Sequence, residues 1–245
     1  SNGVAELLVY KTVKVAIIST GDELIPPGQE IKPGQVYNSN GPLLEALLAN
    51  LPVDVTNHGA MADDFDKISA ALLDLSAHHD VIITTGGASR GEEDHVITAL
   101  ETHGTRHLWQ MAIKPGRPMS FGTLDDALFI GLPGNPVAAF VCFLLYARQI
   151  ILRLSGADWI EPPRFPLPAA FEIEKKKTDR REFQRGILRT IDGVLHVDKF
   201  KRDGSGLITG LREADGLIEI SEDVSAVERG SPVSFIPFSS LGINA

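Results

Sequence analysis

The sequence predicts an α/β domain with a mostly parallel sheet and helices on both faces, followed by a small all-β, barrel-like domain. Two observations predict this division. From residue 13 to residue 158, continuous apolar runs alternate with segments of helical period, which is typical of parallel sheets. In residues 159–245, short alternating segments are separated by turn signals and no helical period remains. Residues 1–12 are interpreted as a residual linker or tag.

Strands and helices follow one another through the first domain. Continuous or alternating apolar runs predict strands at Val13–Ser19, Val53–Asn57, Asp80–Thr84, near Arg106–Ile113 and at Ala127–Ile130. Helical period and capping residues predict helices at Pro42–Asn50, from Asp63-Asp64 to about Ala77, from Asp94 to about Thr102 and at Val137–Leu154. The carboxyl ends of such strands meet at one edge of the sheet, where open α/β sheets bind ligands.

The second domain begins after a proline-rich linker that includes Pro162 and Pro163. Its predicted strands are Phe171–Lys175, Phe183–Leu188, Val194–Val197, Gly216–Ile220 and Pro232–Ile236. Turn pairs such as Asp192-Gly193 separate them. A small barrel or sandwich accommodates this pattern.

Composition excludes several classes of function. Hydrophobic residues make up 43% of the 245 residues and charged residues 22%, as in soluble globular proteins. The net charge of −9 argues against a nucleic-acid partner. The longest apolar run, Val137–Ala147, is too short to span a membrane, and no targeting segment is recognisable. Cys142 is the only cysteine, so no internal disulfide forms. Together these features predict a cytoplasmic protein without a membrane partner.

Two glycine-containing loops are candidates for ligand binding. In Ser19–Leu24 (STGDEL), a glycine beside two carboxylates suits a metal, a helix cap or a plain turn. In Thr84–Gly91, the Gly86-Gly87 pair allows a ligand to approach backbone N–H groups closely, and Ser89 adds a hydroxyl. The helix start beyond this loop suits a phosphate. Asp94 could cap that helix or bind a metal.

Two further loops supply cations and backbone donors. In Lys114–Pro118 (KPGRP), two cations in a proline-stiffened loop suit phosphate or another oxyanion, although a surface ion pair is an alternative. In Gly131–Pro136, two glycines precede a helix whose first turn is set by Pro136. Tight strand-to-helix packing explains Gly134 nearly as well as an anion site does.

Together the four loops predict a polyanion bound through Mg²⁺ at one sheet edge. The oxygen ligands Glu23, Asp63 and Asp94 suit Mg²⁺. The sequence offers no Ser-His-Asp ordering, no Walker-A loop, no GxGxxG after the first strand and no zinc spacing.

Five ordered motifs carry a resemblance to a known family. STGDEL, VYNSNG, TTGGASRGEEDH, KPGRPMSFG and GLPGNP, in this order, resemble the molybdopterin molybdenumtransferase family of the MoeA and gephyrin E-domain type. The resemblance is dense over about residues 10–158 and continues thinly through Phe183–Gly186 and Asp203–Gly206. It implies Mg²⁺-dependent hydrolysis of adenylylated molybdopterin, insertion of molybdate at the dithiolene sulfurs, and release of AMP.

The resemblance also implies site residues. Glu23, Asp63 and Asp94 match acidic positions that would bind the metal or activate water, and Lys114 matches a basic position at the reaction centre. The substrate-binding positions are Thr20, Gly21, Asp22, Thr85, Gly86, Gly87, Ser89, Lys114, Gly116, Arg117, Pro133, Gly134, Asn135, Arg185 and Ser205. The implied partners are adenylylated molybdopterin, molybdate, a second copy in the full-length protein, and the molybdopterin adenylyltransferase.

The sequence departs from the family pattern at several positions. Asn38 stands where the family usually has Asp, Ala88 and Arg90 replace valines, and Gln110 replaces a Lys of some members. Family members also carry two further N-terminal domains that support dimerisation, whereas this sequence starts almost directly at the α/β domain. We therefore expect the fragment to bind ligand yet to catalyse poorly alone.

Two other functions remain open at this stage. A non-catalytic molybdopterin-binding or scaffold module of the gephyrin type would not need three carboxylates around a metal. A molybdopterin adenylyltransferase would consume ATP, and the second domain and the KPGRP loop argue against it.

Overall fold

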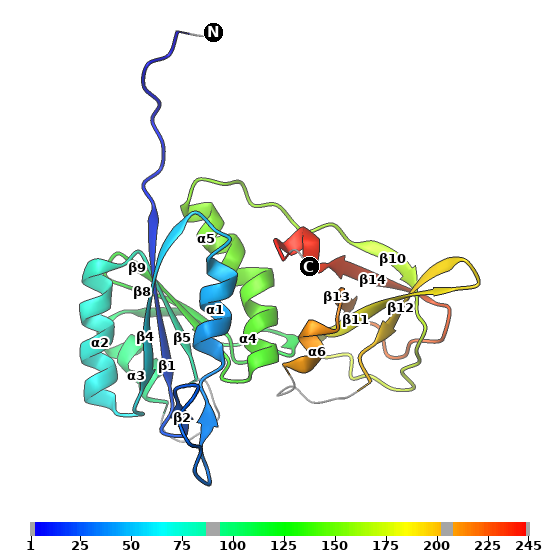
Figure 1. Cartoon of the computed structure of the whole chain (residues 1–245), viewed down its shortest axis with the longest axis horizontal. Helices are drawn as coiled ribbons and strands as arrows, with labels where there is room; N and C mark the ends of the chain where they lie inside the picture. The colour runs from blue at the N-terminus through cyan, green and yellow to red at the C-terminus, as the bar shows by residue number, and fades with distance from the viewer. Residues whose placement is uncertain (1–2, 87–93, 202–207, 244–245) are drawn as a thin grey trace.

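A computed structural model describes residues 3–86, 94–201 and 208–243. The chain forms an α/β part and a β part that lie side by side (Figure 1). The α/β part holds a six-stranded sheet in the order β4-β1-β5-β9-β8-β6. Its parallel strands are β1 (Val13–Thr20), β4 (Val53–Met61), β5 (Val81–Thr85) and β9 (Ala127–Leu132). The remaining strands, β8 (Ser120–Leu124) and β6 (Thr105–Leu108), run antiparallel to their neighbours, so the predicted mostly parallel sheet is confirmed.

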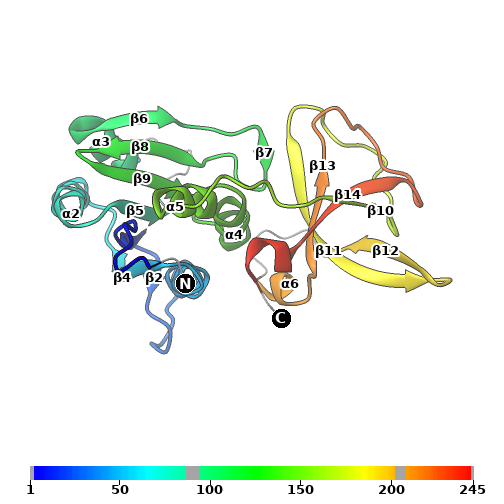
Figure 2. The ribbon, with the colours of Figure 1, turned by 90° about the horizontal axis from the view of Figure 1, so that it is seen from above.

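Helices cover both faces of this sheet (Figure 2). They are α1 (Asn40–Leu48), α2 (Phe65–His78), α3 (His95–His103) and a long helix made of α4 (Pro136–Cys142), a π-helical turn (Phe143–Ala147) and α5 (Arg148–Leu154). Alternate residues of β1 face opposite cores. Val15 and Ile17 pack with α1 and the long helix, whereas Ala16 and Ile18 pack with α2 and α3.

The long helix belongs to the core. By length and composition Pro136–Leu154 could cross a membrane, but 67% of its most apolar window is buried inside the protein. Cys142 lies on this helix and is fully buried, which raises the pKa of its thiol to about 12.

The β part is a curled sheet in the order β10-β14-β13-β11-β12. These strands are β10 (Phe165–Pro168), β11 (Arg181–Ile191), β12 (Val194–Lys199), β13 (Gly216–Ile220) and β14 (Pro232–Pro237). A bridge between Ala169 and Val197 joins the β10 side of the sheet to β12, so the sheet curls around Ile218 and Phe235. The predicted barrel-like β domain is confirmed.

Several predicted elements were wrong in detail. Phe171–Lys175 is not a strand; within it only Ile173 forms an isolated bridge. Strand β10 lies earlier, on two prolines, because an edge strand tolerates missing N–H donors. A four-residue helix, α6 (Thr209–Arg212), and a 3₁₀ turn (Phe238–Leu241) interrupt the expected all-β pattern. The predicted strand Arg106–Ile113 is divided between two sheets, and β8 was not predicted.

The two parts share a short strand. β7 (Ile113–Lys114) leaves the α/β part and pairs in parallel with the start of β11 (Figure 2). The Arg181 N–H donates to the Ala112 carbonyl at 2.9 Å. A separate two-stranded ribbon, β2 (Leu24–Ile25) and β3 (Val36–Tyr37), projects from the α/β part.

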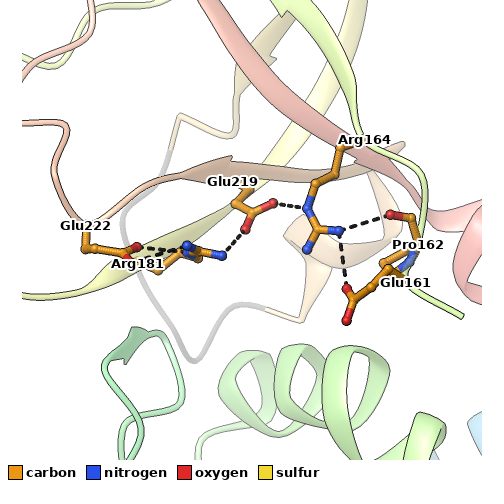
Figure 3. Close-up of polar contacts among 6 residues, drawn as sticks. All are labelled: Glu161, Pro162, Arg164, Arg181, Glu219 and Glu222. Atoms are coloured by element: carbon orange, nitrogen blue, oxygen red, sulfur yellow. Dashed lines mark hydrogen bonds and ion pairs between the residues drawn. The ribbon is translucent and has the colours of Figure 1, made fainter. Parts of the chain in front are cut away.

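An ion-pair chain ties the linker to the β part (Figure 3). The Glu219 side chain is 5% exposed and accepts hydrogen bonds from Arg164 and from Arg181, the latter at 3.0 Å. Arg181 also donates to Glu222 at 2.9 Å, and Arg164 donates to the Pro162 carbonyl. One buried carboxylate is therefore shared by two guanidinium groups from different segments, and each guanidinium has a second carboxylate partner, Glu161 or Glu222.

We expect Glu219→Gln to lower the free energy of unfolding by about 2 kcal/mol, because two partly buried arginines lose their shared counter-charge. Glu222→Gln is the matched control. Its carboxylate is 54% exposed, so its loss should cost less stability than the loss of the Glu219 carboxylate. Urea unfolding of both variants measures the difference, and equal costs would show that the buried carboxylate has no special role.

Candidate active site at the strand ends

The loops after β1, β4, β5 and β9 meet at the carboxyl edge of the sheet. The Gly21 N–H donates to the Met61 carbonyl at 3.1 Å, which joins the first two loops. Asn40 Nδ2 donates to the Gly134 carbonyl at 2.8 Å, which ties α1 to the fourth loop. A Cβ at Gly134 would lie 3.4 Å from the Gly86 Cα, so the loops after β5 and β9 are in contact.

Residue 86 must be glycine unless the surrounding backbone rearranges. Its φ is +92°, a conformation that other residues rarely adopt, and a Cβ there would collide with the Thr20 carbonyl oxygen. The Thr20 and Thr84 hydroxyls are buried nearby without a hydrogen-bond partner in the structure. Buried polar groups are normally paired, so these hydroxyls are candidates to bind a ligand or water.

Buried side-chain hydrogen bonds connect the ends of β1 and β5 to Asn38 at this edge. Thr85 Oγ1 donates to Ser19 Oγ, and Ser19 Oγ donates to Asn38 Oδ1, each at 3.1 Å. The Gly41 N–H also donates to Asn38 Oδ1 at 3.1 Å. The Asn38 amide oxygen therefore accepts two hydrogen bonds that a carboxylate could also accept. Ser19 and Thr84 were missed by sequence reasoning, although small polar residues at the ends of apolar strands were a usable signal.

Only some of the carboxylates at this edge of the sheet cap a helix. Asp64 caps α2 by accepting from the Lys67 N–H at 3.0 Å, so the cap is Asp64 and not Asp63. The Asp63 N–H donates to Asp22 Oδ1 at 3.0 Å, which joins the loops after β1 and β4. The Glu23 carboxylate folds over Gly21 within its own turn.

Asp94 is both a cap and a perturbed acid. It accepts from the Ile97 N–H at 3.1 Å as the cap of α3, so the capping interpretation is confirmed. The pKa of its carboxyl is raised from 3.8 to about 6, mainly by burial and in part by the charge of Asp63, while the hydrogen bond from Ile97 acts in the opposite direction. Asp63 and Asp94 are therefore close enough to interact electrostatically.

This pair of carboxylates fits an open Mg²⁺ site better than a closed cage. Within the described ranges, no three His, Cys, Asp or Glu side chains converge in a geometry that could hold a metal ion. Mg²⁺ in proteins is commonly held by one or two carboxylates together with substrate phosphates and water. Bound Mg²⁺ would also offset the charge of Asp63, which contributes with burial to the raised pKa of Asp94.

The basic loop reaches the same edge by an unpredicted route. It follows β7, which joins the second sheet, and not a parallel strand of the first. It leads into β8, where Ser120 pairs with Gly131 of β9, and so its end lies at the strand-end edge. Gly116 packs against Cys142, whose Sγ lies 3.6 Å from the Gly116 carbonyl oxygen.

The two cations of this loop have partners that leave them accessible. Lys114 Nζ lies 3.3 Å from Glu182 Oε1, and the Lys114 side chain is 58% exposed. Arg117 Nε donates to Gln110 Oε1 at 3.1 Å. The ion-pair alternative is thus correct for Lys114, although its exposed ammonium can still bind an anion.

The other predicted binding residues are distributed as follows. Asn135 accepts from the Ala138 N–H and caps α4, directly after Pro133 and Gly134. Arg185 lies on β11 with its guanidinium 4.6 Å from the centre of the Phe200 ring. Gly87, Ser89 and Ser205, with the departures Ala88 and Arg90, lie outside the described residues.

The site is a glycine-lined edge with acidic side chains, and comparison with known proteins identifies the family of the chain. A family model described as "Probable molybdopterin binding domain" matches residues 16–153, more than half of the chain. The chain belongs to the molybdopterin-binding family. A second model, "MoeA C-terminal region (domain IV)", matches residues 167–238 and places the chain in the MoeA branch that its motifs resemble.

Individual relatives agree with this family. The chain is 35% identical over 243 residues to a molybdopterin molybdenumtransferase of Haemophilus influenzae, covering 98% of the chain and 60% of the relative. It is 34% identical over 218 residues to the molybdenum cofactor synthesis protein cinnamon of Drosophila melanogaster, covering 89% of the chain and 36% of the relative. The chain thus spans about half the length of these MoeA-type relatives.

Solved structures agree as well. The crystal structure of a molybdopterin biosynthesis MoeA protein from Pyrococcus horikoshii matches with a TM-score of 0.77 and 30% identity. The match covers 93% of this chain and 55% of that one. Both the α/β part and the β part of the fold therefore belong to the MoeA architecture.

Proposed function

We propose that this chain carries the molybdate-inserting site of molybdenum cofactor biosynthesis. Its substrates are adenylylated molybdopterin and molybdate, and its products are AMP and the molybdenum-loaded pterin. The observation that supports this proposal most strongly is that the loops after β1, β4, β5 and β9 converge at one sheet edge, near the start of the helix that Asp94 caps. The match to the MoeA C-terminal region favours this reaction over the adenylyltransferase alternative.

Residues at the carboxyl edge of the sheet have different roles in the proposed reaction. Backbone N–H groups around Gly86 and Gly134, which pack against each other, receive the adenylate phosphate. Asp63 and Asp94 would hold Mg²⁺, which when bound would neutralise charge on the phosphate oxygens. Glu23, at the neighbouring turn, accepts a proton from the water molecule that attacks the adenylate phosphorus. Lys114 and Arg117 bind molybdate.

The wider assignments are part of the same proposal. The full-length protein acts as a homodimer in the cytoplasm, and it receives its substrate from the molybdopterin adenylyltransferase. A reactive intermediate is protected when it passes directly between enzymes, which favours such a contact.

A turnover assay tests the proposed reaction. Purified chain is incubated with adenylylated molybdopterin, molybdate and Mg²⁺, and AMP is quantified by chromatography. We expect AMP release that requires both Mg²⁺ and molybdate. Consumption of ATP with free molybdopterin would instead identify an adenylyltransferase, and failure to bind adenylylated molybdopterin would favour a scaffold.

We expect Lys114→Ala to weaken molybdate binding about tenfold, because one charge-assisted contact to the oxyanion is lost. The Kd is measured by calorimetric titration with sodium molybdate. Lys11→Ala serves as the control, since Lys11 is an exposed lysine that pairs with Asp80 away from this loop. An unchanged molybdate Kd in Lys114→Ala would remove the lysine from the site.

A further inference from the structure

An exposed tryptophan lies at the same edge of the sheet as the glycine loops. Strand β6 is antiparallel to β8, and β8 is antiparallel to β9, so β6 runs in the same direction as the parallel strands. Trp109 directly follows Leu108, the last residue of β6. Trp109 therefore belongs to the carboxyl edge, at the end formed by the outermost strand of the sheet (Figure 2).

The indole ring of Trp109 is held in place and is still accessible. The guanidinium carbon of Arg106 lies 5.3 Å from the centroid of the ring. Arg106 Nη2 in turn lies 2.6 Å from Glu101 Oε1 on α3, and the Arg106 side chain is only 24% exposed. Trp109 itself is 58% exposed, whereas tryptophan is highly buried on average in proteins. A ring that is fixed by a cation and remains exposed is suited to stack with a flat ligand.

Hydrogen bonds also attach the residues after Trp109 to the basic loop. Gln110 Oε1 accepts a hydrogen bond from Arg117 Nε at 3.1 Å. The Met111 N–H donates to the Arg117 carbonyl at 3.0 Å. Trp109 is therefore fixed beside a cationic loop, and this combination suits a ligand that carries both a flat ring and negative charge.

The spacing between Trp109 and the phosphate-binding loops suits one nucleotide. The strand order at this end of the sheet is β9-β8-β6. Two strand spacings, about 10 Å, therefore separate the loop that follows β9 from the end of β6. In an adenylate the ribose separates the base from the phosphate, so a phosphate at Gly134 allows the base to reach Trp109.

The position of Lys114 distinguishes between the two flat rings of the substrate. Lys114 contacts Glu182 of the β part at 3.3 Å, whereas Trp109 follows the outermost strand of the α/β part. In adenylylated molybdopterin, the sulfurs that take molybdate belong to the pterin half. Adenine is therefore the ring that lies away from molybdate and near Trp109.

We propose that Trp109 is a specificity-determining residue that stacks on the adenine base of the adenylylated substrate. The phosphate then lies at the loops of Gly86 and Gly134, and the ribose crosses the start of β8. The identity of this ligand rests on the proposed function. Stacking of one base on an aromatic side chain changes affinity by about tenfold, and this effect depends on the base and not on the ribose or the phosphate.

Calorimetric titrations of the full chain with AMP and with ribose 5-phosphate, which lacks the base, test this placement. Trp109→Ala is compared with Trp159→Ala, because Trp159 is 48% exposed and lies before β10, where its Nε1 donates to Glu161. We expect Trp109→Ala to weaken AMP binding about tenfold and to leave the Kd of ribose 5-phosphate unchanged. Trp159→Ala should change neither Kd. Circular dichroism verifies that both variants remain folded.

Fluorescence provides a second readout in which Trp109 is intact. The chain has two tryptophans, so Trp159→Phe leaves Trp109 as the only indole, and Trp109→Phe leaves Trp159. Stacking of the base on Trp109 should quench the emission of the Trp159→Phe variant during titration with AMP, whereas ribose 5-phosphate should not. The emission of the Trp109→Phe variant should stay constant with both probes.

Three results would each overturn the stacking. They are a failure of AMP to bind, equal weakening of AMP and ribose 5-phosphate in Trp109→Ala, and unchanged Trp109 emission while AMP binds. If AMP stacks on Trp109 but the turnover assay releases no AMP, the proposed reaction fails and the stacking stands. If turnover proceeds and Trp109 emission does not respond to AMP, the proposed reaction stands and the stacking is wrong.

Discussion

Asp94→Asn is expected to abolish AMP release while making the protein more stable at pH 7.5. Asparagine caps a helix as well as aspartate does, so the hydrogen bond to the Ile97 N–H is kept. The substitution removes a carboxylate that the reaction needs, and AMP release should fall by a factor of about 100 or more.

The stability gain follows from the sign of the pKa shift. Burial raises the pKa of Asp94 to about 6 in the folded chain, above its ordinary 3.8. Between these two values the folded state binds more protons, so the wild-type chain loses stability as pH rises from about 4 to above 6. After allowance for partial exposure, Asp94→Asn should gain about 1 kcal/mol at pH 7.5 and nothing near pH 4.

Thermal unfolding at several pH values and the AMP assay together check this prediction. Asp94→Ala is the comparison, because it removes the cap as well as the charge and gives up about 1 kcal/mol of helix stability. If the asparagine variant is destabilised like the alanine variant and still turns over, Asp94 is only a helix cap.

Gly86→Ala is expected to be the most damaging single change at the strand ends. The substitution adds a methyl group at φ +92°, where it also meets the Thr20 carbonyl oxygen. Strained backbone and a main-chain collision together should cost about 3 kcal/mol. Displacement of the Gly86 loop should also remove AMP binding, because the loop contacts Gly134.

Gly28→Ala separates the cost of the strained backbone from the cost of the main-chain collision. Gly28 has the same φ of +92°, but a Cβ there meets no atom within 4 Å. Its substitution should therefore cost only about 1 kcal/mol and leave AMP binding intact. Similar costs at both positions, measured by urea unfolding, would contradict the close packing of Gly86 on Thr20.

The parallel strands were predictable because burial on both faces leaves an uninterrupted apolar run. Val13–Ser19 and Asp80–Thr84 correspond closely to β1 and β5. The position of the glycine loops followed, since parallel strands end at a common edge. Which of Asp63 and Asp64 caps α2 was not predictable, because both residue types cap equally well and only the backbone path decides.

The junction between the two parts could not be predicted from the local sequence pattern. Ile113–Lys114 is too short to show a strand period, and its partner β11 lies almost 70 residues later in the chain. The segment 171–175 alternates like a strand, yet its backbone is bound to the loop around Val227 by single bridges. Neither feature could therefore be predicted from the local sequence alone.

Calorimetric titration of this chain with adenylylated molybdopterin, with and without Mg²⁺, tests the central claim most directly. We predict binding that is strengthened by Mg²⁺ and loses this dependence in Asp94→Asn. Equal affinity with and without Mg²⁺ that is also unchanged in Asp94→Asn would contradict a metal-assisted site at the Asp63–Asp94 pair.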